Sequence, residues 1–188
     1  MMASVSLVAA DPRRDAPVVQ RWLADPHAAF WQMGGHDVDA VCDYLASVVT
    51  DPYQDGWLGL VDGAPTFFAE TYDPAHVLLS GIHDTLPGDL GMHVLIAPPG
   101  DHPRRGLTDA VFAAVMAWCF DELGAERVVV EPDARNHLIR RKNVRAGFTE
   151  LRHVTIEDGA HSKAAVLSVC TRDDYRRSEL AATGKALV

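Results

Sequence analysis

Two spacings of apolar side chains along the chain distinguish its predicted helices from its predicted strands. Between residues 37 and 50, apolar residues recur every three or four positions, as in a helix with one buried side. Asp37 precedes this run and is suited to cap the helix. A second helical pattern covers residues 16–31 and is broken at Pro26. The side chains predicted to be buried in the 37–50 helix are Val38, Val41, Cys42, Leu45, Val48 and Val49.

Apolar runs with strand character fill much of the remaining chain. "GWLGLVDGAPTFFAETYD" (56–73) predicts a hairpin that turns at Asp62-Gly63. "DLGMHVLIA" (89–97) is almost continuously apolar, as expected for a central strand buried on both faces. Residues 76–82 predict a short strand or an ordered loop. Further strands are predicted at 5–10, 127–131, 149–156 and 163–170.

Two more helical patterns lie between these strands. One covers residues 106–124 and ends at Gly124, and the other runs from a cap at Asn136 to Gly147. The chain from about residue 179 is expected to be a frayed end. The order β-α-α-β-β-(β)-β-α-β-α-β-β predicts a mixed α/β fold in one domain, residues 1–188.

The composition of the chain argues against some classes of function. The chain has 188 residues, is 48% hydrophobic and carries a formal net charge of -9, which argues against a general nucleic-acid or anionic-membrane partner. It has neither an apolar run of about 18–20 residues nor a signal-peptide pattern. Its three scattered cysteines are typical of a reduced, cytoplasmic protein. The nine histidines lack metal-ligand spacing, so no metal site is expected.

The start of the 106–124 helix is a candidate anion site. Pro103 fits the first helical position, which would leave the amides of Arg104, Arg105 and Gly106 without intrahelical partners. Such amides, with the helix dipole, favour a phosphate group. An ordinary helix start with a solvated basic turn explains the same residues.

His93 and Asp133 are the candidates for proton transfer. His93 lies in the 89–97 strand, and histidine is well suited to exchange protons near neutral pH. A core histidine bonded to a backbone carbonyl explains it equally. Asp133 follows the 127–131 strand, at the sheet edge where ligands of open α/β folds collect. The two side chains are therefore expected to face one cleft.

Several stretches resemble one known family in order and spacing. The stretches are "VVQRWLADPHAAFW", "PTFFAETYD", "GDLGMHVLIAPP", "RVVVEPDARN", "RAGF" and "HSKAAVLSVCTRDDY", which together cover about residues 16–176. They resemble the GNAT N-acyltransferases, and more narrowly the acyltransferases of hydroxamate siderophore biosynthesis in the aerobactin, alcaligin, mycobactin and desferrioxamine pathways. The phosphate turn departs from the family pattern, because in "PRRGLT" only Gly106 fits it.

The resemblance implies a GNAT-like mixed central sheet of about seven strands flanked by about four helices. It also implies transfer of an acetyl or succinyl group from acyl-CoA to the hydroxylamine nitrogen of an N-hydroxylated diamine or lysine. The enzyme would be an N-acyltransferase without a metal, acting on a small molecule as a monomer or homodimer. Two alternatives stay open: a GNAT N-acetyltransferase for a protein N-terminus or an aminoglycoside, and a non-catalytic acyl-CoA-binding module.

The resemblance assigns His93 as the general base and Asp133 as an acid that assists or orients it. A backbone amide around Leu95 or Ile96 is expected to polarise the thioester carbonyl. Three side chains, Trp31, Glu70 and Tyr72, are candidates for the acceptor pocket, although Trp31 equally suits the core. The residues expected to contact the acyl-CoA are Leu95, Ile96, Arg104, Arg105, Gly106, Leu107, Asn136 and Arg140.

Overall fold

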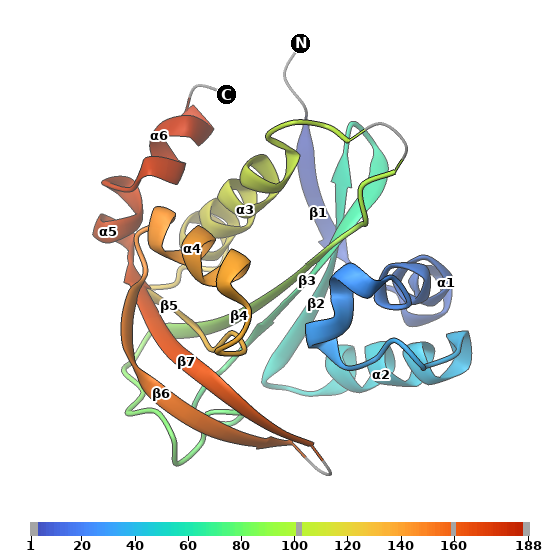
Figure 1. The fold of residues 1–188 in the computed structure, drawn as a ribbon, viewed down its shortest axis with the longest axis horizontal. Helices are drawn as coiled ribbons and strands as arrows, with labels where there is room; N and C mark the ends of the chain where they lie inside the picture. The colour runs from blue at the N-terminus through green and yellow to red at the C-terminus, as the bar shows by residue number, and fades with distance from the viewer. Residues whose placement is uncertain (1–3, 101–102, 159–160, 186–188) are drawn as a thin grey trace. The chain divides into compact units, whose positions relative to one another are not determined.

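The computed structural model describes residues 4–100, 103–158 and 161–185. Within these residues a sheet of seven strands has the order β1-β2-β3-β4-β5-β7-β6 (Figure 1). The strands are β1 (Val5–Ala9), β2 (Gln54–Val61), β3 (Ala64–Tyr72), β4 (Asp89–Ile96), β5 (Arg127–Val130), β6 (Thr149–Asp158) and β7 (His161–Thr171). The mixed α/β class and the sheet of about seven strands are thereby confirmed.

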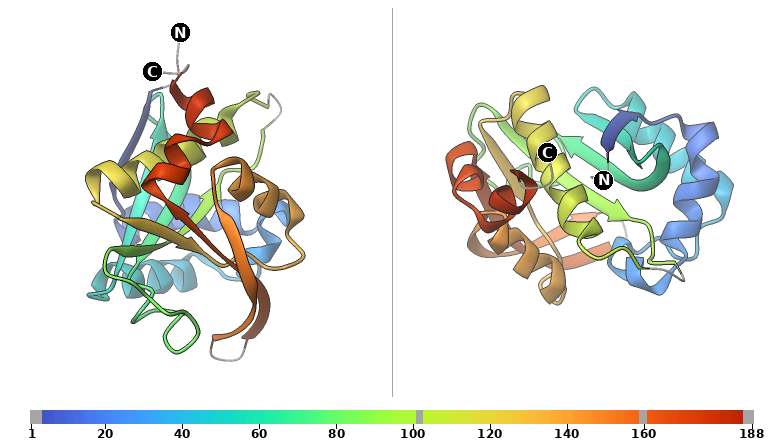
Figure 2. Two further views of the ribbon diagram at one scale, coloured as in Figure 1. Left: turned by 90° about the vertical axis from the view of Figure 1, so that its left-hand side faces the viewer. Right: turned by 90° about the horizontal axis from the view of Figure 1, so that it is seen from above.

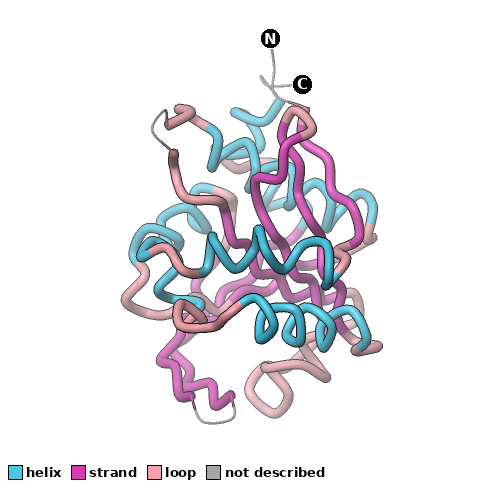
Figure 3. Tube along the Cα trace, turned by 90° about the vertical axis from the view of Figure 1, so that its right-hand side faces the viewer, coloured by secondary structure: helices cyan, strands magenta, loops and turns pink. Residues whose placement is uncertain are grey.

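Helices lie between β1 and β2, between β4 and β5 and between β5 and β6, and two more follow β7; Figure 3 distinguishes the helices from the strands by colour. The α-helices are α1 (Pro12–Leu23), α2 (Val38–Thr50), α3 (Leu107–Ala117), α4 (His137–Arg145), α5 (Arg172–Arg176) and α6 (Glu179–Lys185). A 3-10 helix, η1 (Pro26–Trp31), follows α1, and a π-helical turn, η2 (Trp118–Glu122), extends α3. Of the helices in the described ranges, none combines the length and the apolar character that a membrane span requires.

The chain divides into two compact units. The first comprises Met1–Thr71 and His93–Phe112, and the second comprises Tyr72–Met92 and Ala113–Val188.

In the first unit, α1 and α2 pack side by side (Figure 1). β1 and β2 run antiparallel, from Val5 opposite Val61 to Ala9 opposite Trp57. The predicted hairpin turn is confirmed, since Asp62 and Gly63 both have positive φ, at 52° and 79°. The core beneath the two helices contains Ala16, Val19, Trp22, Leu23, Ala28, Val41, Leu45, Leu58, Phe68 and Leu95.

Both early helices differ in detail from the prediction. α1 begins at Pro12, because the Asp11 side chain accepts a hydrogen bond from the Arg14 amide at 2.9 Å and caps the helix there. α2 is capped by Asp37 as predicted, but Val38 and Val49 at its ends are 39% and 38% exposed. The predicted buried stripe was therefore too wide.

The second unit holds the other half of the sheet. β4 and β5 pair in parallel from Asp89–Arg127 to Gly91–Val129, and β7 runs antiparallel to both β5 and β6. Figure 2 shows β6 and β7 as a long, bent pair of strands. α4 ends as predicted, because Gly147 has a φ of 93° and the Phe148 amide donates to the Asn143 carbonyl at 3.0 Å.

Buried charges fix the beginning of β4. Asp89 accepts hydrogen bonds from Nε and Nη2 of Arg127, each at 2.7 Å, and from the Leu86 amide at 2.9 Å. His83 Nε2 lies 3.2 Å from the same carboxylate. Burial raises the pKa of Asp89, but the hydrogen bonds from Arg127 and Leu86 outweigh it, so the pKa lies below its usual value.

The structure corrects the predicted bounds of the long helix, decides between the two alternatives for residues 76–82 and corrects the prediction for the tail. The long helix begins at Leu107 and is α-helical only to Ala117, where the π-helical turn takes over. Residues 76–82 form an ordered loop and not a strand. The tail was predicted to fray, but residues 179–185 form α6, which the fully buried Leu180 anchors by apolar contact, while residues 186–188 lie outside the described residues.

Candidate active site

His93 on β4 and Glu70 on β3 face each other. The Ala97 amide donates to the Thr66 carbonyl at 2.8 Å, which fixes the pairing of the two chain segments. Four residues back along β4 and four forward along β3, His93 contacts Glu70, so the two contacts together show that the strands run antiparallel here. Nδ1 of His93 lies 3.0 Å from Oε2 of Glu70. Two residues predicted for different roles are thereby brought into one hydrogen-bonded pair.

A tyrosine on α2 and a tryptophan at the end of η1 lie against this pair. Tyr44 on α2 donates a hydrogen bond from its hydroxyl to Oε1 of Glu70. The Trp31 ring lies edge-on to the His93 ring, with centroids 6.1 Å apart. The Glu70 side chain is only 6% exposed, whereas 25% of the His93 side chain is open to solvent. The carboxylate is thus enclosed, while the imidazole keeps an accessible edge.

The strand pattern explains why a carboxylate lies inside the fold. Side chains two apart on a strand share a face, so Glu70 projects to the same side as Phe68, which belongs to the core under α1 and α2. A buried carboxylate is costly unless its oxygens are hydrogen-bonded. Tyr44 and His93 satisfy one oxygen each.

A carboxylate next to an imidazole favours proton uptake by the ring, because its negative charge stabilises the imidazolium form. The pair of Glu70 and His93 is therefore suited to remove a proton from a ligand at the exposed edge of the ring. Sequence reasoning identified His93 but assigned Glu70 to the acceptor pocket. The available signal was an acid between two residues of a buried strand face, Phe68 and Tyr72.

Asp133 lies after β5, where it bridges to Ala165 of β7. Its side chain is 3% exposed and accepts hydrogen bonds from the amide, Nε and Nη2 of Arg135, at 2.9, 2.9 and 2.8 Å. The Arg135 guanidinium holds the pKa of Asp133 below its usual value, although burial opposes this. Asp133 is thus an ionised carboxylate bound to Arg135, and its predicted support of His93 stays a prediction.

Tyr72 lies in the interior of the second unit. Its hydroxyl donates to Oε2 of Glu131 at 2.6 Å, and Lys163 Nζ lies 3.5 Å from the other oxygen. Tyr72 is 2% exposed, and the Glu131 side chain is fully buried. Sequence reasoning did not single out Glu131 or Lys163. Tyr72 was predicted to contact the acceptor, and that prediction remains.

The candidate anion turn has a different backbone from the one predicted. Gly106 has a φ of 79°, a left-handed conformation that cannot lie within a right-handed helix. Its carbonyl accepts the Ala110 amide at 3.0 Å, so Gly106 precedes α3 and Leu107 is the first helical residue. The prediction that Pro103 begins the helix was wrong.

Several predicted acyl-CoA side chains contact protein groups. Nη2 of Arg104 donates to Asp62 at 2.9 Å, and both side chains are about half exposed. Arg140 bonds Glu150 through Nε and Nη2, at 2.9 and 3.0 Å. Asn136 caps α4, as its side chain accepts the Ile139 amide at 3.3 Å.

The end of β4 joins the core and η1. Leu95 is 2% exposed in the core under α1 and α2. The carbonyl of Ile96 accepts a hydrogen bond from Nε2 of His27 at 2.6 Å, and Nδ1 of the same ring lies 3.0 Å from Asp25. His27 was not among the predicted site residues.

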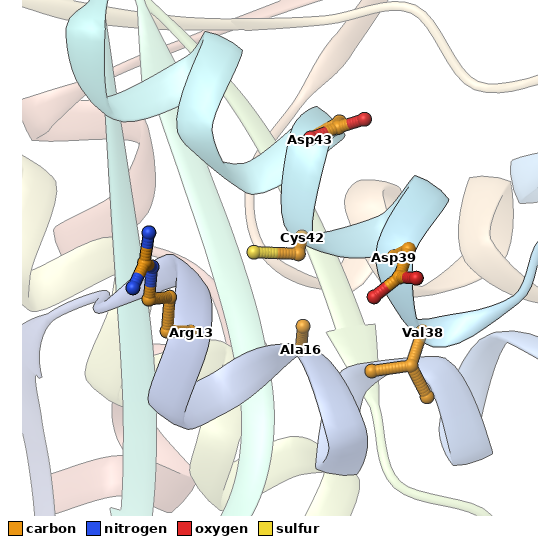
Figure 4. A pocket seen from close by; sticks show the side chains of 6 residues that line it. All are labelled: Arg13, Ala16, Val38, Asp39, Cys42 and Asp43. Atoms are coloured by element: carbon orange, nitrogen blue, oxygen red, sulfur yellow. The ribbon is translucent and has the colours of Figure 1, made fainter.

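A groove of about 410 Å³ lies between α1 and α2 (Figure 4). Two of its side chains come from α1 and four from α2, and none belongs to the predicted site. The lining residues are Arg13, Ala16, Val38, Asp39, Cys42 and Asp43.

Residues 11–156 match the family model of an acetyltransferase (GNAT) domain. The chain belongs to the GNAT acetyltransferase family. The matched region contains both His93 and Glu70, and also Asp133. The candidate site therefore lies within the part of the chain that matches the GNAT domain.

Curated relatives of this GNAT chain are named as acyltransferases. It is 31% identical over 129 residues to lysine N-acyltransferase MbtK of Mycolicibacterium paratuberculosis (strain ATCC BAA-968 / K-10), covering 68% of this chain and 58% of that protein. It is 26% identical over 152 residues to N(6)-hydroxylysine O-acetyltransferase of Escherichia coli, covering 76% of this chain and 45% of that protein. The chain therefore matches only about half the length of these relatives.

A solved structure of similar fold is the aminoglycoside acetyltransferase AAC(6')-Ib in complex with paromomycin and acetyl-CoA. It has a TM-score of 0.75 and 24% sequence identity, and the match covers 93% of this chain and 97% of that one. At this identity the likeness concerns the fold.

Proposed function

We propose that the chain transfers an acyl group from acyl-CoA to the hydroxylamine nitrogen of an N-hydroxylated diamine or lysine. The hydrogen-bonded pair of His93 and Glu70 carries the proposal, because an imidazole beside a carboxylate on β4 of a GNAT domain is suited to accept a proton. The names of two relatives, a lysine N-acyltransferase and an N(6)-hydroxylysine O-acetyltransferase, support an acceptor derived from lysine or a similar diamine.

The proposed reaction is direct attack by the hydroxylamine nitrogen on the thioester carbonyl. The new C–N bond forms, the C–S bond breaks, and CoA leaves as the free thiol. A hydroxylamine is largely neutral near pH 7, so His93 accepts the nitrogen's proton as the tetrahedral intermediate forms and passes it to the departing sulfur. Positioned proton transfer of this kind contributes about 10²–10⁴-fold to the rate. A backbone amide around Leu95 or Ile96 would stabilise the oxyanion.

Acetyl-CoA or succinyl-CoA is the proposed acyl donor. The amides of Arg104, Arg105 and Gly106, in the turn that precedes α3, remain the proposed ligands of the CoA phosphates, together with Leu107 as a further donor contact. Arg105 is exposed in this turn and adds positive charge there. Asn136 and Arg140 remain proposed donor contacts.

Trp31 is the proposed first contact for the acceptor. It is partly buried and lies edge-on to His93, so an acceptor at the exposed edge of the imidazole would also meet the indole. Asp133 remains the proposed second carboxylate of the site. It would act through its own negative charge or by orienting the acceptor.

The likeness in fold to an aminoglycoside acetyltransferase supports a second candidate function, transfer to an aminoglycoside amine. Both candidates release CoA from acetyl-CoA, so acceptor identity separates them. An acetyl-CoA turnover assay with N-hydroxycadaverine, cadaverine and paromomycin as acceptors makes the comparison. The proposal expects release of the CoA thiol with N-hydroxycadaverine, and preferential turnover of paromomycin would establish the alternative.

Replacing His93 tests its proposed role in the same assay. His93→Ala is expected to lower kcat by about 10²–10⁴-fold, while CoA affinity in a calorimetric titration stays unchanged. The matched control is His36→Ala, because His36 is an exposed histidine of the same compact unit. Unchanged turnover in His93→Ala would remove His93 from the mechanism.

A further inference from the structure

We infer that Glu70 is the positioning residue of the acyl transfer, and that Tyr44 fixes the carboxylate so that His93 keeps its proton on Nδ1 and accepts the substrate proton on Nε2. The inference rests on the proposed function and deepens it. It assigns the partner of the base to β3, whereas the sequence resemblance had pointed to Asp133.

The contacts of Glu70 define the tautomer of the neutral ring. Oε2 of Glu70 lies 3.0 Å from Nδ1 of His93, and an ionised carboxylate can only accept hydrogen bonds. Nδ1 must therefore carry the proton, and in a neutral imidazole the basic lone pair is then on Nε2. The partner of one ring nitrogen thus determines which nitrogen exchanges protons.

Tyr44 fixes the orientation of the carboxylate. Its hydroxyl donates to Oε1, so the two oxygens of Glu70 have different partners on α2 and β4. The Glu70 side chain is 6% exposed, which limits competition from water. A carboxylate held in this way orients the imidazole and stabilises the imidazolium without taking the proton itself.

The carboxylate of Asp133 already has its own partner. Both of its oxygens accept hydrogen bonds from Arg135, at 2.8 and 2.9 Å. Glu70 instead contacts the imidazole directly through one oxygen, and its other oxygen accepts a hydrogen bond from Tyr44. The local chemistry therefore favours Glu70 as the group that sets the protonation state of His93.

The proton balance follows from this assignment. The substrate nitrogen gives its proton to Nε2 of His93 as the C–N bond forms. Nδ1 keeps its proton, and Glu70 stays ionised throughout. When the C–S bond breaks, Nε2 returns the proton to the sulfur, so the enzyme leaves the cycle in its starting state.

Glu70→Gln is the decisive variant because the change is nearly isosteric. Tyr44 donates to the oxygen of the new amide, which turns the amide NH₂ group toward His93. An NH₂ group donates, so Nδ1 must accept and the neutral ring must carry its proton on Nε2. The variant is therefore expected to hold the wrong tautomer for catalysis, in a fold that is otherwise retained.

Nitrogen-15 NMR of the histidine rings tests the tautomer without any turnover. The wild-type chain should show neutral His93 protonated on Nδ1, with its signals assigned by their loss in His93→Gln. Glu70→Gln should show the opposite tautomer, and Asp133→Asn should leave the wild-type one. An unchanged His93 tautomer in Glu70→Gln would overturn the inference.

Kinetics with acetyl-CoA and N-hydroxycadaverine form the second test. Glu70→Gln should lower kcat by at least about 10²-fold with little change in the KM for acetyl-CoA. Glu122→Gln, which changes an exposed glutamate, is the control.

A double variant separates positioning from general damage. In Tyr44→Phe/Glu70→Gln the amide can rotate and present its oxygen to Nδ1, so turnover should recover at least about fivefold over Glu70→Gln alone. A further loss would contradict the role of Tyr44. If the wild-type chain transfers no acyl group to any hydroxylamine, the proposed function fails, and the NMR comparison still decides the pairing of Glu70 with His93.

Discussion

A methyl group on Gly91 is predicted to destabilise the fold, because an aromatic ring occupies the space beside it on β4. A Cβ atom at Gly91 would lie 2.2 Å from Cε2 and Cζ of Tyr72, well inside the 3.4 Å at which ordinary contact begins. Tyr72 is 2% exposed, and its hydroxyl donates to Glu131 at 2.6 Å. The ring therefore cannot move away without weakening a buried hydrogen bond to a carboxylate.

The size of the destabilisation follows from two unfavourable contributions and one favourable contribution to the free energy of unfolding. Overpacking a core costs about 1–3 kcal/mol, and a hydrogen bond to a charged group contributes about 1.5–3 kcal/mol when fully formed. Replacing glycine by alanine returns about 0.4–1 kcal/mol by restricting the unfolded chain. With the hydrogen bond partly retained, Gly91→Ala should lower the free energy of unfolding by about 2–3 kcal/mol. For a chain of this size the melting temperature should fall by roughly 8 °C.

Thermal unfolding followed by circular dichroism measures this change. Gly35→Ala is the control, because no atom lies within 4 Å of its added Cβ, and it should alter stability by less than about 0.5 kcal/mol. In a Tyr72→Ala background the ring is absent, so Gly91→Ala should leave the free energy of unfolding almost unchanged. An equal cost of Gly91→Ala in both backgrounds would refute the steric explanation.

Two further predictions concern buried charges and thiols. Asp89→Asn should lower the free energy of unfolding at pH 7 by about 3 kcal/mol, because it leaves the partly buried Arg127 guanidinium without its counter-charge. The stabilisation from the low pKa of Asp89 is fully present above its unfolded value of about 3.9 and disappears as the pH falls through the folded value, so urea midpoints of wild type and variant should converge in acid. Burial raises the pKa of both Cys119 and Cys170 to about 12, so only the partly exposed Cys42 should react with a thiol reagent in the native protein. Rapid labelling of two or more thiols per chain would contradict this.

Local signals explain which elements the sequence pattern located correctly. The 37–50 helix, the Asp62-Gly63 turn and the Gly147 helix end each depend on residues next to the feature they determine. The start of α3 did not follow from such a signal, because Pro103 suits a helix start but Gly106 adopts a left-handed backbone afterwards. The tail was predicted to fray because it lies at the end of the chain, yet burial of Leu180 is a tertiary contact that holds residues 179–185.

The candidate site, too, could be predicted only where a local sequence signal exists. His93 was identifiable from its residue type within an apolar strand. Its pairing with Glu70 depends on the register between β3 and β4 and on a helix that brings Tyr44 to the carboxylate. Register is a property of the whole sheet, so a single strand pattern does not specify it. Asp133 was found from its place after a predicted strand. Its hydrogen bond to Arg135 joins residues only two positions apart, so it is a local contact that could have been predicted from the sequence.

Competition between two acceptors tests the central claim most directly. Cadaverine and N-hydroxycadaverine are mixed at equal concentration with limiting acetyl-CoA and the wild-type chain, and mass spectrometry measures the ratio of the two acetylated products. That ratio reports the ratio of kcat/KM values. The proposed function predicts an excess of the hydroxamate of at least about 10²-fold, confirmed by its colour with ferric iron. Equal amounts of the two products, or an excess of acetylcadaverine, would contradict it.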